Sequence, residues 1–146
     1  MPRSAHDAIK ATALDYVEGW FQGDNARMRR ALSPHLRKCT ITRDPVSGKM
    51  TVGEPYNNAD RMVRLTANGV MKEDGVEVSA EVLYVFRDIA IARTVCPYFE
   101  DLLHLANFGE YGWRIVNALW QETEGETKIS VAEDMKYWAQ DAGASS

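Results

Sequence analysis

The feature that most constrains this chain is a change in the spacing of its apolar residues. In the first half they recur every three or four positions, whereas between residues 76 and 86 they occupy every second position, as Val76, Val78, Ala80, Val82, Tyr84 and Phe86. The first spacing is typical of helices with one buried stripe, and the second is typical of a strand with one packed face. The sequence therefore predicts an α+β domain in which helices precede an antiparallel sheet.

Three helices are predicted before the change in spacing. They cover residues 5–22, residues 24–32, and a stretch that Asn57 or Asn58 can cap and that ends at Asn68-Gly69. The first ends at a glycine, which suits the left-handed residue after a helix, and the second ends before a proline. Tyr16 and Trp20 lie on the apolar stripe of the first helix, and Met62 lies on that of the third.

Five strands are predicted, over residues 35–43, 76–86 and 89–99 and in the two halves of the stretch 101–120, which a turn at 109–112 divides. In that last stretch His104 lies in phase with neighbouring apolar residues, so we expect it to face inward and Asp101 to face the other side. Strict alternation also puts Trp113 and Trp120 on opposite faces of their strand. At most one of these tryptophans can then line an interior pocket.

The last residues predict one further helix, over 131–140. Ser130 and Glu133 match a capping box, in which each side chain bonds to the backbone N–H of the other residue. We therefore expect a single domain over residues 1–128, followed by a C-terminal helical extension and frayed tail over 129–146.

Composition excludes several classes of function. The net charge of −4 argues against a nucleic-acid binder, which would carry a basic excess. No apolar run approaches the roughly 18 residues of a membrane span, and residues 1–10 lack the apolar core of a signal peptide. Cys39 and Cys96 have no metal or redox spacing. We expect a cytoplasmic protein with reduced thiols that binds neither nucleic acid nor membrane.

Metal and cofactor motifs are equally absent from the sequence. His6, His35 and His104 fall on different predicted elements and do not form a spaced cluster of ligands. The glycines at 109–112 belong to a hairpin turn and not to a phosphate-binding loop. We expect neither a metal nor a cofactor.

Four strings of residues stand out: ALDYVEGWFQGD at 13–24, LSPHL at 32–36, RDP at 43–45, and DLLHL at 101–105 leading to WRIVNALW at 113–120. In their order and spacing they resemble the bacterial family called putative lumazine-binding. That family belongs to the nuclear-transport-factor-2-like superfamily, with the ketosteroid isomerases. The resemblance implies a cystatin-like cone, in which three helices close one side of a curved sheet around a pocket and the sheet mediates a homodimer. No residue pattern here requires lumazine itself as the ligand.

The resemblance also implies candidate catalytic residues. In ketosteroid isomerases a tyrosine on the first helix, an aspartate after the first strand and an acidic donor on a late strand line the pocket. Tyr16 and Asp44 are similar to the first two, His35 is an alternative base, and His104 stands about where the isomerases have the acid. A carboxylate base beside neutral O–H donors can form and stabilise an enolate. Each of these residues also has a structural interpretation, as a core, turn or strand residue.

The predicted pocket is mainly aromatic. Its expected lining residues are Tyr16, Trp20, Tyr56, Met62, Tyr84, Phe86, His104 and Trp120. Three functions fit this chain: a non-catalytic binder of a small apolar or aromatic molecule, a cofactor-independent isomerase, dehydratase or cyclase, and a dimeric protein-interaction module. The fold alone does not decide among them, because one fold hosts unrelated functions.

Overall fold

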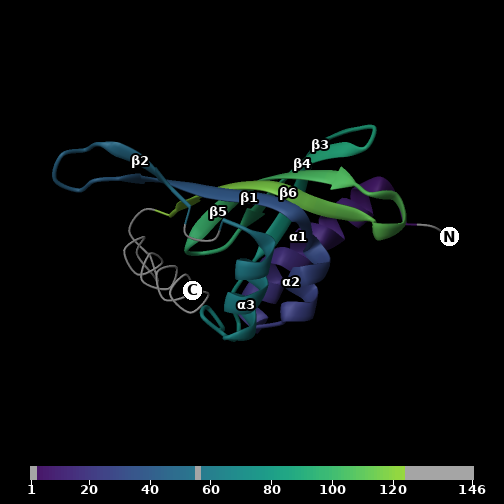
Figure 1. The fold of residues 1–146 in the computed structure, drawn as a ribbon, viewed down its shortest axis with the longest axis horizontal. Coiled ribbons are helices and arrows are strands. Elements are labelled where there is room, and N and C mark those ends of the chain that lie inside the picture. Colours follow the sequence, from purple (N-terminus) through teal and green to yellow (C-terminus); the bar gives the residue numbers. More distant parts are fainter. Residues whose placement is uncertain (1–2, 55–56, 124–146) are drawn as a thin grey trace.

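The computed structural model describes residues 3–54 and 57–123. Within them three α-helices lie on one side of a six-stranded sheet (Figure 1). The helices are α1 (Ala5–Gln22), α2 (Asn25–Ala31) and α3 (Ala59–Ala67), at the three predicted places. Each begins at a side chain that accepts a backbone N–H of the first turn, from Ser4, Asp24 and Asn58 respectively.

The sheet contains β1 (Leu32–Arg43), β2 (Met50–Gly53), β3 (Ser79–Phe86), β4 (Ile89–Val95), β5 (Phe99–Asn107) and β6 (Trp113–Glu122). Its spatial order is β2-β1-β6-β5-β4-β3, with β1 and β6 parallel and all other pairs antiparallel. The short strand β2 is not predicted from the sequence, and with the end of β1 it forms a hairpin that projects beyond the other strands (Figure 1). A single 3₁₀ turn, Gly109–Tyr111, joins β5 to β6.

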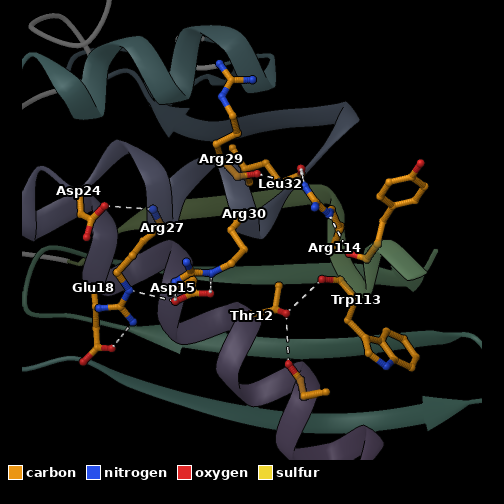
Figure 2. Close-up of polar contacts among 12 residues, drawn as sticks. Thr12, Asp15, Glu18, Asp24, Arg27, Arg29, Arg30, Leu32, Trp113 and Arg114 are labelled. Carbon is orange, nitrogen blue, oxygen red and sulfur yellow. Dashed lines mark hydrogen bonds and ion pairs between the residues drawn. The ribbon is translucent and has the colours of Figure 1, made fainter. Parts of the chain in front are cut away.

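Ion pairs join the first two helices. Arg27 Nε lies 2.9 Å from Asp15 Oδ1, Arg27 Nη2 lies 2.8 Å from Glu18 Oε1, and Arg30 Nε lies 2.9 Å from Asp15 Oδ2 (Figure 2). Burial raises the pKa of Asp15, but the hydrogen bonds from Arg30 and Arg27 outweigh that effect and hold the pKa below its ordinary value. The two helices therefore form one unit against the sheet.

Two β-bulges change which side chains face the helices. In β3 the register shifts between Val82 and Tyr84, and in β6 an extra residue lies opposite the step from His104 to Leu105. An extra residue reverses the alternation of every side chain that follows it. The bulge in β3 leaves Tyr84 and Phe86 61% and 55% exposed, so the prediction that they line an interior pocket is wrong.

The bulge in β6 keeps both tryptophans of that strand buried. Trp113 and Ile115 precede it, Ala118 and Trp120 follow it, and all four side chains are buried. Strict alternation would have turned one tryptophan outward, so the expectation of opposite faces is wrong.

The inward face of β5 is also the reverse of the expected one. Asp101, Leu103 and Leu105 are buried beneath the helices, whereas Leu102 and His104 are exposed on the outer face. In β1 the inward side chains include Leu36, Lys38 and Thr40. Two charged residues, Lys38 and Asp101, are thereby placed in the core.

The predicted helix at 131–140, the division of the chain at residue 128 and the predicted pocket residue Tyr56 all involve positions outside the described residues. Over residues 3–54 and 57–123, no helix has the length and apolar character needed to cross a membrane.

Candidate functional site

A row of side chains across four strands forms the base of the candidate site. The strand register aligns Thr40 of β1 with Trp120 of β6, Trp120 with Asp101 of β5, and Asp101 with Thr94 of β4. All four residues are buried, with Asp101 and Thr40 fully enclosed. The sheet therefore presents a row with three buried polar side chains to the helices, within a core that is mostly apolar.

Helices α1 and α3 supply the cover. Tyr16 and Trp20 are four residues apart on α1, so both side chains point to the same side of that helix. Met62 comes from the buried face of α3. Lys38, two residues before Thr40 on β1, has Ala118 as its register partner, a residue with a single methyl side chain.

Lys38, Tyr16 and Asp101 form a hydrogen-bonded chain. Lys38 Nζ donates to Tyr16 Oη over 2.6 Å, and Tyr16 Oη donates to Asp101 Oδ1 over 2.9 Å. The three residues are 6%, 3% and 0% exposed, so a cation and an acid are joined in the core through a neutral hydroxyl. A buried charge is tolerated only where such partners compensate for lost hydration.

Aromatic rings surround the ammonium group of this chain. Lys38 Nζ lies 5.0 Å from the ring centroid of Tyr16, 5.7 Å from that of Trp120 and 6.0 Å from that of Trp20. Met62 Sδ lies 3.8 Å from the same nitrogen. Rings at these distances attract a cation through their negative faces. We call Lys38, Tyr16, Asp101, Trp20 and Trp120 the aromatic site.

Asp101 is the acid of the aromatic site, and its pKa is raised. Complete burial raises its pKa, and the nearby Lys38 charge and the Tyr16 hydrogen bond offset only part of that rise. Its second oxygen, Oδ2, is buried and makes no well-formed hydrogen bond within residues 3–54 and 57–123, although the hydroxyl of Thr94, its register partner on β4, also lowers the pKa of Asp101. A carboxyl group in this setting can donate a hydrogen bond when protonated and accept one when ionised.

Four of the predicted pocket residues come together here, namely Tyr16, Trp20, Met62 and Trp120. Their role in binding a ligand stays a prediction. Lys38 and Asp101 were missed. The one signal in the sequence is the strand phase, because Lys38 alternates in step with Leu36 and Thr40, and Asp101 alternates in step with Leu103 and Leu105.

The structure separates the three other candidate catalytic residues from the aromatic site. Asp44 lies in the exposed turn after β1, where its Oδ1 accepts the backbone N–H of Val46 and of Ser47, both at 2.8 Å. Both hydrogen bonds lower the pKa of Asp44, and the one from Ser47 has the larger effect. Asp44 therefore stabilises its own turn, and the expectation that it points into a pocket is wrong.

Both candidate histidines also lie outside the aromatic site. His35 is exposed at the start of β1, beside Pro34, where its backbone N–H bonds to Ser33 Oγ at 3.0 Å. His104 lies on the outer face of β5, with its Nδ1 3.3 Å from Asn117 Nδ2. His104 faces away from the helices because the phase of β5 is set by Asp101, Leu103 and Leu105.

Within the described part of the chain, no three His, Cys, Asp or Glu residues are grouped so that they could hold a metal ion. The two cysteines are free thiols. Cys96 is buried, and this burial raises the pKa of its thiol.

Solved structures with the same fold come from several organisms. An NTF2-like protein of unknown function from Shewanella baltica has a TM-score of 0.60 and 19% identity, with 81% of this chain and 93% of that chain covered. A ketosteroid isomerase-like protein from Erwinia carotovora has a TM-score of 0.57 and 12% identity, with 84% and 99% covered. The CaMKII hub of S. rosetta has a TM-score of 0.56 and 11% identity, with 84% and 100% covered.

At these identities the likeness shows the fold, which is NTF2-like, and not the activity. No curated protein matches this chain. A family model matches residues 4–121, which include every described helix and all of the aromatic site. The chain belongs to the family described as "Putative lumazine-binding".

Proposed function

We propose that this protein binds a small molecule with a planar, largely apolar body and at least one polar group, and that the aromatic site holds it. The observation that carries this proposal is the Lys38–Tyr16–Asp101 chain inside a ring of aromatic side chains. Apolar residues of similar volume would fill a purely structural core at lower cost in desolvation. Buried groups with perturbed pKa values and charged partners are concentrated at functional sites.

The chemistry of the site indicates which ligands suit it. The Lys38 ammonium can donate to a carbonyl oxygen or an anionic oxygen of a ligand. Asp101 Oδ2 can accept a hydrogen bond from a ligand N–H or O–H. Trp20 and Trp120 offer flat apolar surfaces. A heteroaromatic ring with carbonyl and N–H groups satisfies all of these contacts, and lumazine, named in the family's description, is one such ring.

Tryptophan fluorescence provides the test, because Trp20 and Trp120 adjoin the Lys38 ammonium. A panel of heteroaromatic and aromatic compounds, including lumazine, is titrated into the protein. We expect saturable quenching by at least one compound, with Kd raised about tenfold or more in Lys38→Met, which removes a charge-assisted contact. The matched control is Lys10→Met, an exposed lysine on α1 outside the site.

Two results would contradict the proposal. One is the absence of quenching across the panel. The other is an unchanged Kd in Lys38→Met, provided that circular dichroism shows that variant to be folded.

A second candidate function is enolisation by an isomerase, dehydratase or cyclase that needs no cofactor. One observation favours it: Tyr16 is hydrogen-bonded to Asp101, a carboxyl group on a late strand with a raised pKa. A neutral acid and a phenol side by side can donate hydrogen bonds to an enolate oxygen. In this proposal Asp101, and not His104, takes the place of the acid in the isomerase pattern.

The bases that the sequence suggests lie outside the aromatic site. Asp44 and His35 are both exposed, so neither can take a proton from a ligand held beside Asp101. Deuterium exchange at the carbon next to a ketone, followed by NMR in D₂O over a panel of ketones, tests this function. Exchange that is lost in Asp101→Asn would favour an enzyme, and no exchange above the solvent rate would leave binding alone.

We also propose that the protein forms a homodimer through the outer face of the sheet. Large apolar side chains are exposed there on β3, β4, β5 and β6: Tyr84, Phe86, Ile89, Ile91, Leu102 and Leu119. A contiguous exposed apolar patch of this kind is typical of an interaction surface. Sedimentation velocity should give a dimer for the native chain and a monomer for Leu102→Lys, and a monomeric native chain would contradict the proposal.

A further inference from the structure

A cavity lies outside the aromatic site, on the side of the molecule where α2 and α3 meet the beginnings of β1 and β6. Its volume is about 430 Å³, within the range of small-molecule sites. It is lined by Arg29, Leu32, Pro34, Asn58, Ala59, Asp60, Arg61, Val63, Arg64 and Arg114. None of these residues belongs to the aromatic site. We call this cavity the arginine groove.

The arginine groove is strongly basic in a chain that is acidic overall. Among the described residues that line it, four are arginines and one is an aspartate, whereas the whole chain has a net charge of −4. Arginines gathered in this way attract anions.

Arg114 is held in place without losing its charge. Its Nε donates to the carbonyl oxygen of Tyr111 at 3.1 Å, and its Nη1 donates to the carbonyl oxygens of Arg29 and Leu32 at 3.2 and 3.4 Å (Figure 2). These acceptors are neutral, and no carboxylate of the described residues pairs with this guanidinium. The guanidinium is therefore positioned by the fold and keeps its positive charge for a ligand.

Arg29 and Arg30 are neighbours in sequence but have different roles. Figure 2 shows Arg30 pointing toward Asp15, with which it pairs, and Arg29 pointing away from that pair. The Arg29 side chain is 64% exposed, and its contact with Asp60 is loose, at 3.6 Å between Nη1 and Oδ1. An exposed pair of this kind contributes little and can exchange its aspartate for another anion.

The third helix contributes the opposite wall. Arg61 Nη1 donates to Asn57 Oδ1 at 2.6 Å, so its guanidinium is fixed at the start of α3. Leu32 and Val63 are buried residues that form the apolar part of the lining. The groove thus combines an apolar part with arginines from α2, α3 and β6.

We propose that the arginine groove is a binding site for a small organic anion, in which a phosphate or carboxylate group meets the arginines and an apolar body lies against Leu32 and Val63. Guanidinium groups recognise both kinds of anion through paired N–H donors. The arginine groove is a second site, in addition to the aromatic site, and each of the two sites can hold its ligand independently.

NMR titration of the isotope-labelled native chain tests the proposal, with phenyl phosphate, benzoate and inorganic phosphate as probes at low ionic strength. We expect saturable shifts at the Arg114 Nε–Hε and at the backbone N–H groups of residues 58–64. Phenyl phosphate or benzoate should bind more tightly than inorganic phosphate, because only the organic anions bury an apolar body. Whichever of phenyl phosphate and benzoate binds more tightly shows whether the groove prefers a phosphate or a carboxylate group. Added salt should weaken the binding of both.

Two double variants test whether the arginine groove is where phenyl phosphate binds. Arg29→Gln combined with Arg64→Gln removes two exposed arginines and should raise the Kd of phenyl phosphate about tenfold, roughly 1.4 kcal/mol. Arg37→Gln combined with Arg43→Gln is the matched control, because it removes the same charge from exposed positions outside the groove. Equal effects of the two double variants would overturn the proposal.

Asp60→Asn gives a test that loss of folding cannot imitate. It removes the one acidic residue among the described residues that line the groove and releases Arg29, so phenyl phosphate should bind about threefold more tightly. Unchanged or weaker binding in this variant would contradict the proposal, as would shifts in the native chain that do not saturate. Quenching of tryptophan by ligands of the aromatic site should not change in any of these variants.

Discussion

Replacement of Asp101 by asparagine should change how the stability of this protein depends on pH. Asparagine keeps the shape of the side chain, and its amide oxygen can still accept the hydrogen bond from Tyr16 Oη. It cannot take up or release a proton. The difference between the native chain and Asp101→Asn therefore isolates the buried carboxyl group.

The sign follows from the direction of the pKa shift. The ordinary pKa of this carboxyl is 3.8, and burial raises it in the folded state. Between those two pKa values the folded chain holds a proton that the unfolded chain has lost, so the free energy of unfolding falls as pH rises. For one proton the slope is at most about 1.4 kcal/mol per pH unit, and it returns to zero above the pKa of the folded state.

Urea unfolding at intervals between about pH 4 and pH 8 measures this slope. We expect the native chain to lose stability relative to Asp101→Asn as pH rises from the ordinary pKa of this carboxyl to its raised pKa in the folded state. Lys38→Met combined with Asp101→Asn is a second reference, since it leaves no buried charge without its partner. A difference that is flat with pH, or that grows in favour of the native chain, would refute the assignment of a raised pKa to Asp101.

Two further predictions concern hydrogen bonds of known geometry. Tyr16→Phe removes the donor to Asp101 and the acceptor for Lys38, and should lower the free energy of unfolding by about 2 to 3 kcal/mol. The control Tyr111→Phe, at a position 67% exposed, should change it by less than about 0.5 kcal/mol, and equal losses in thermal unfolding would contradict the prediction. Asp15→Asn weakens the contacts with Arg27 and Arg30 and should cost about 1 kcal/mol at pH 7, a modest value because both arginines are partly exposed. The pKa of Asp15 is lowered in the fold, so its contribution is lost as pH falls below about 4, and a cost that persists at pH 2 would argue against the ion pairs.

The helices could be predicted because their signals are local. Asp24 and Asn58 cap the helices that follow them, and Gly23 adopts a φ of 68° after α1, a left-handed conformation that glycine reaches without strain. Each signal depends only on residues within one turn of the helix. The order of the elements followed from the change in apolar spacing, which is also read along the chain.

The inward faces of three strands could not be predicted in the same way. Strand period gives a face only if the count of residues is unbroken, and the bulges in β3 and β6 each add one residue. Nothing in the apolar pattern marks them: Tyr84 and Phe86 continue the alternation of β3 although their side chains have turned outward. In β5 the adjacent Leu102 and Leu103 fit either phase equally well.

Asp101 and Lys38 explain why the candidate site was found only in part. Taken alone, each charged residue in a strand is expected on the solvent side, since neither can be buried without a partner. The partner of each is distant in sequence, and Tyr16, from a third element, completes the chain between them. The burial of any one of these residues depends on the other two. A sequence read one element at a time therefore placed Tyr16 correctly, by its helical stripe, and assigned Asp101 to the wrong face.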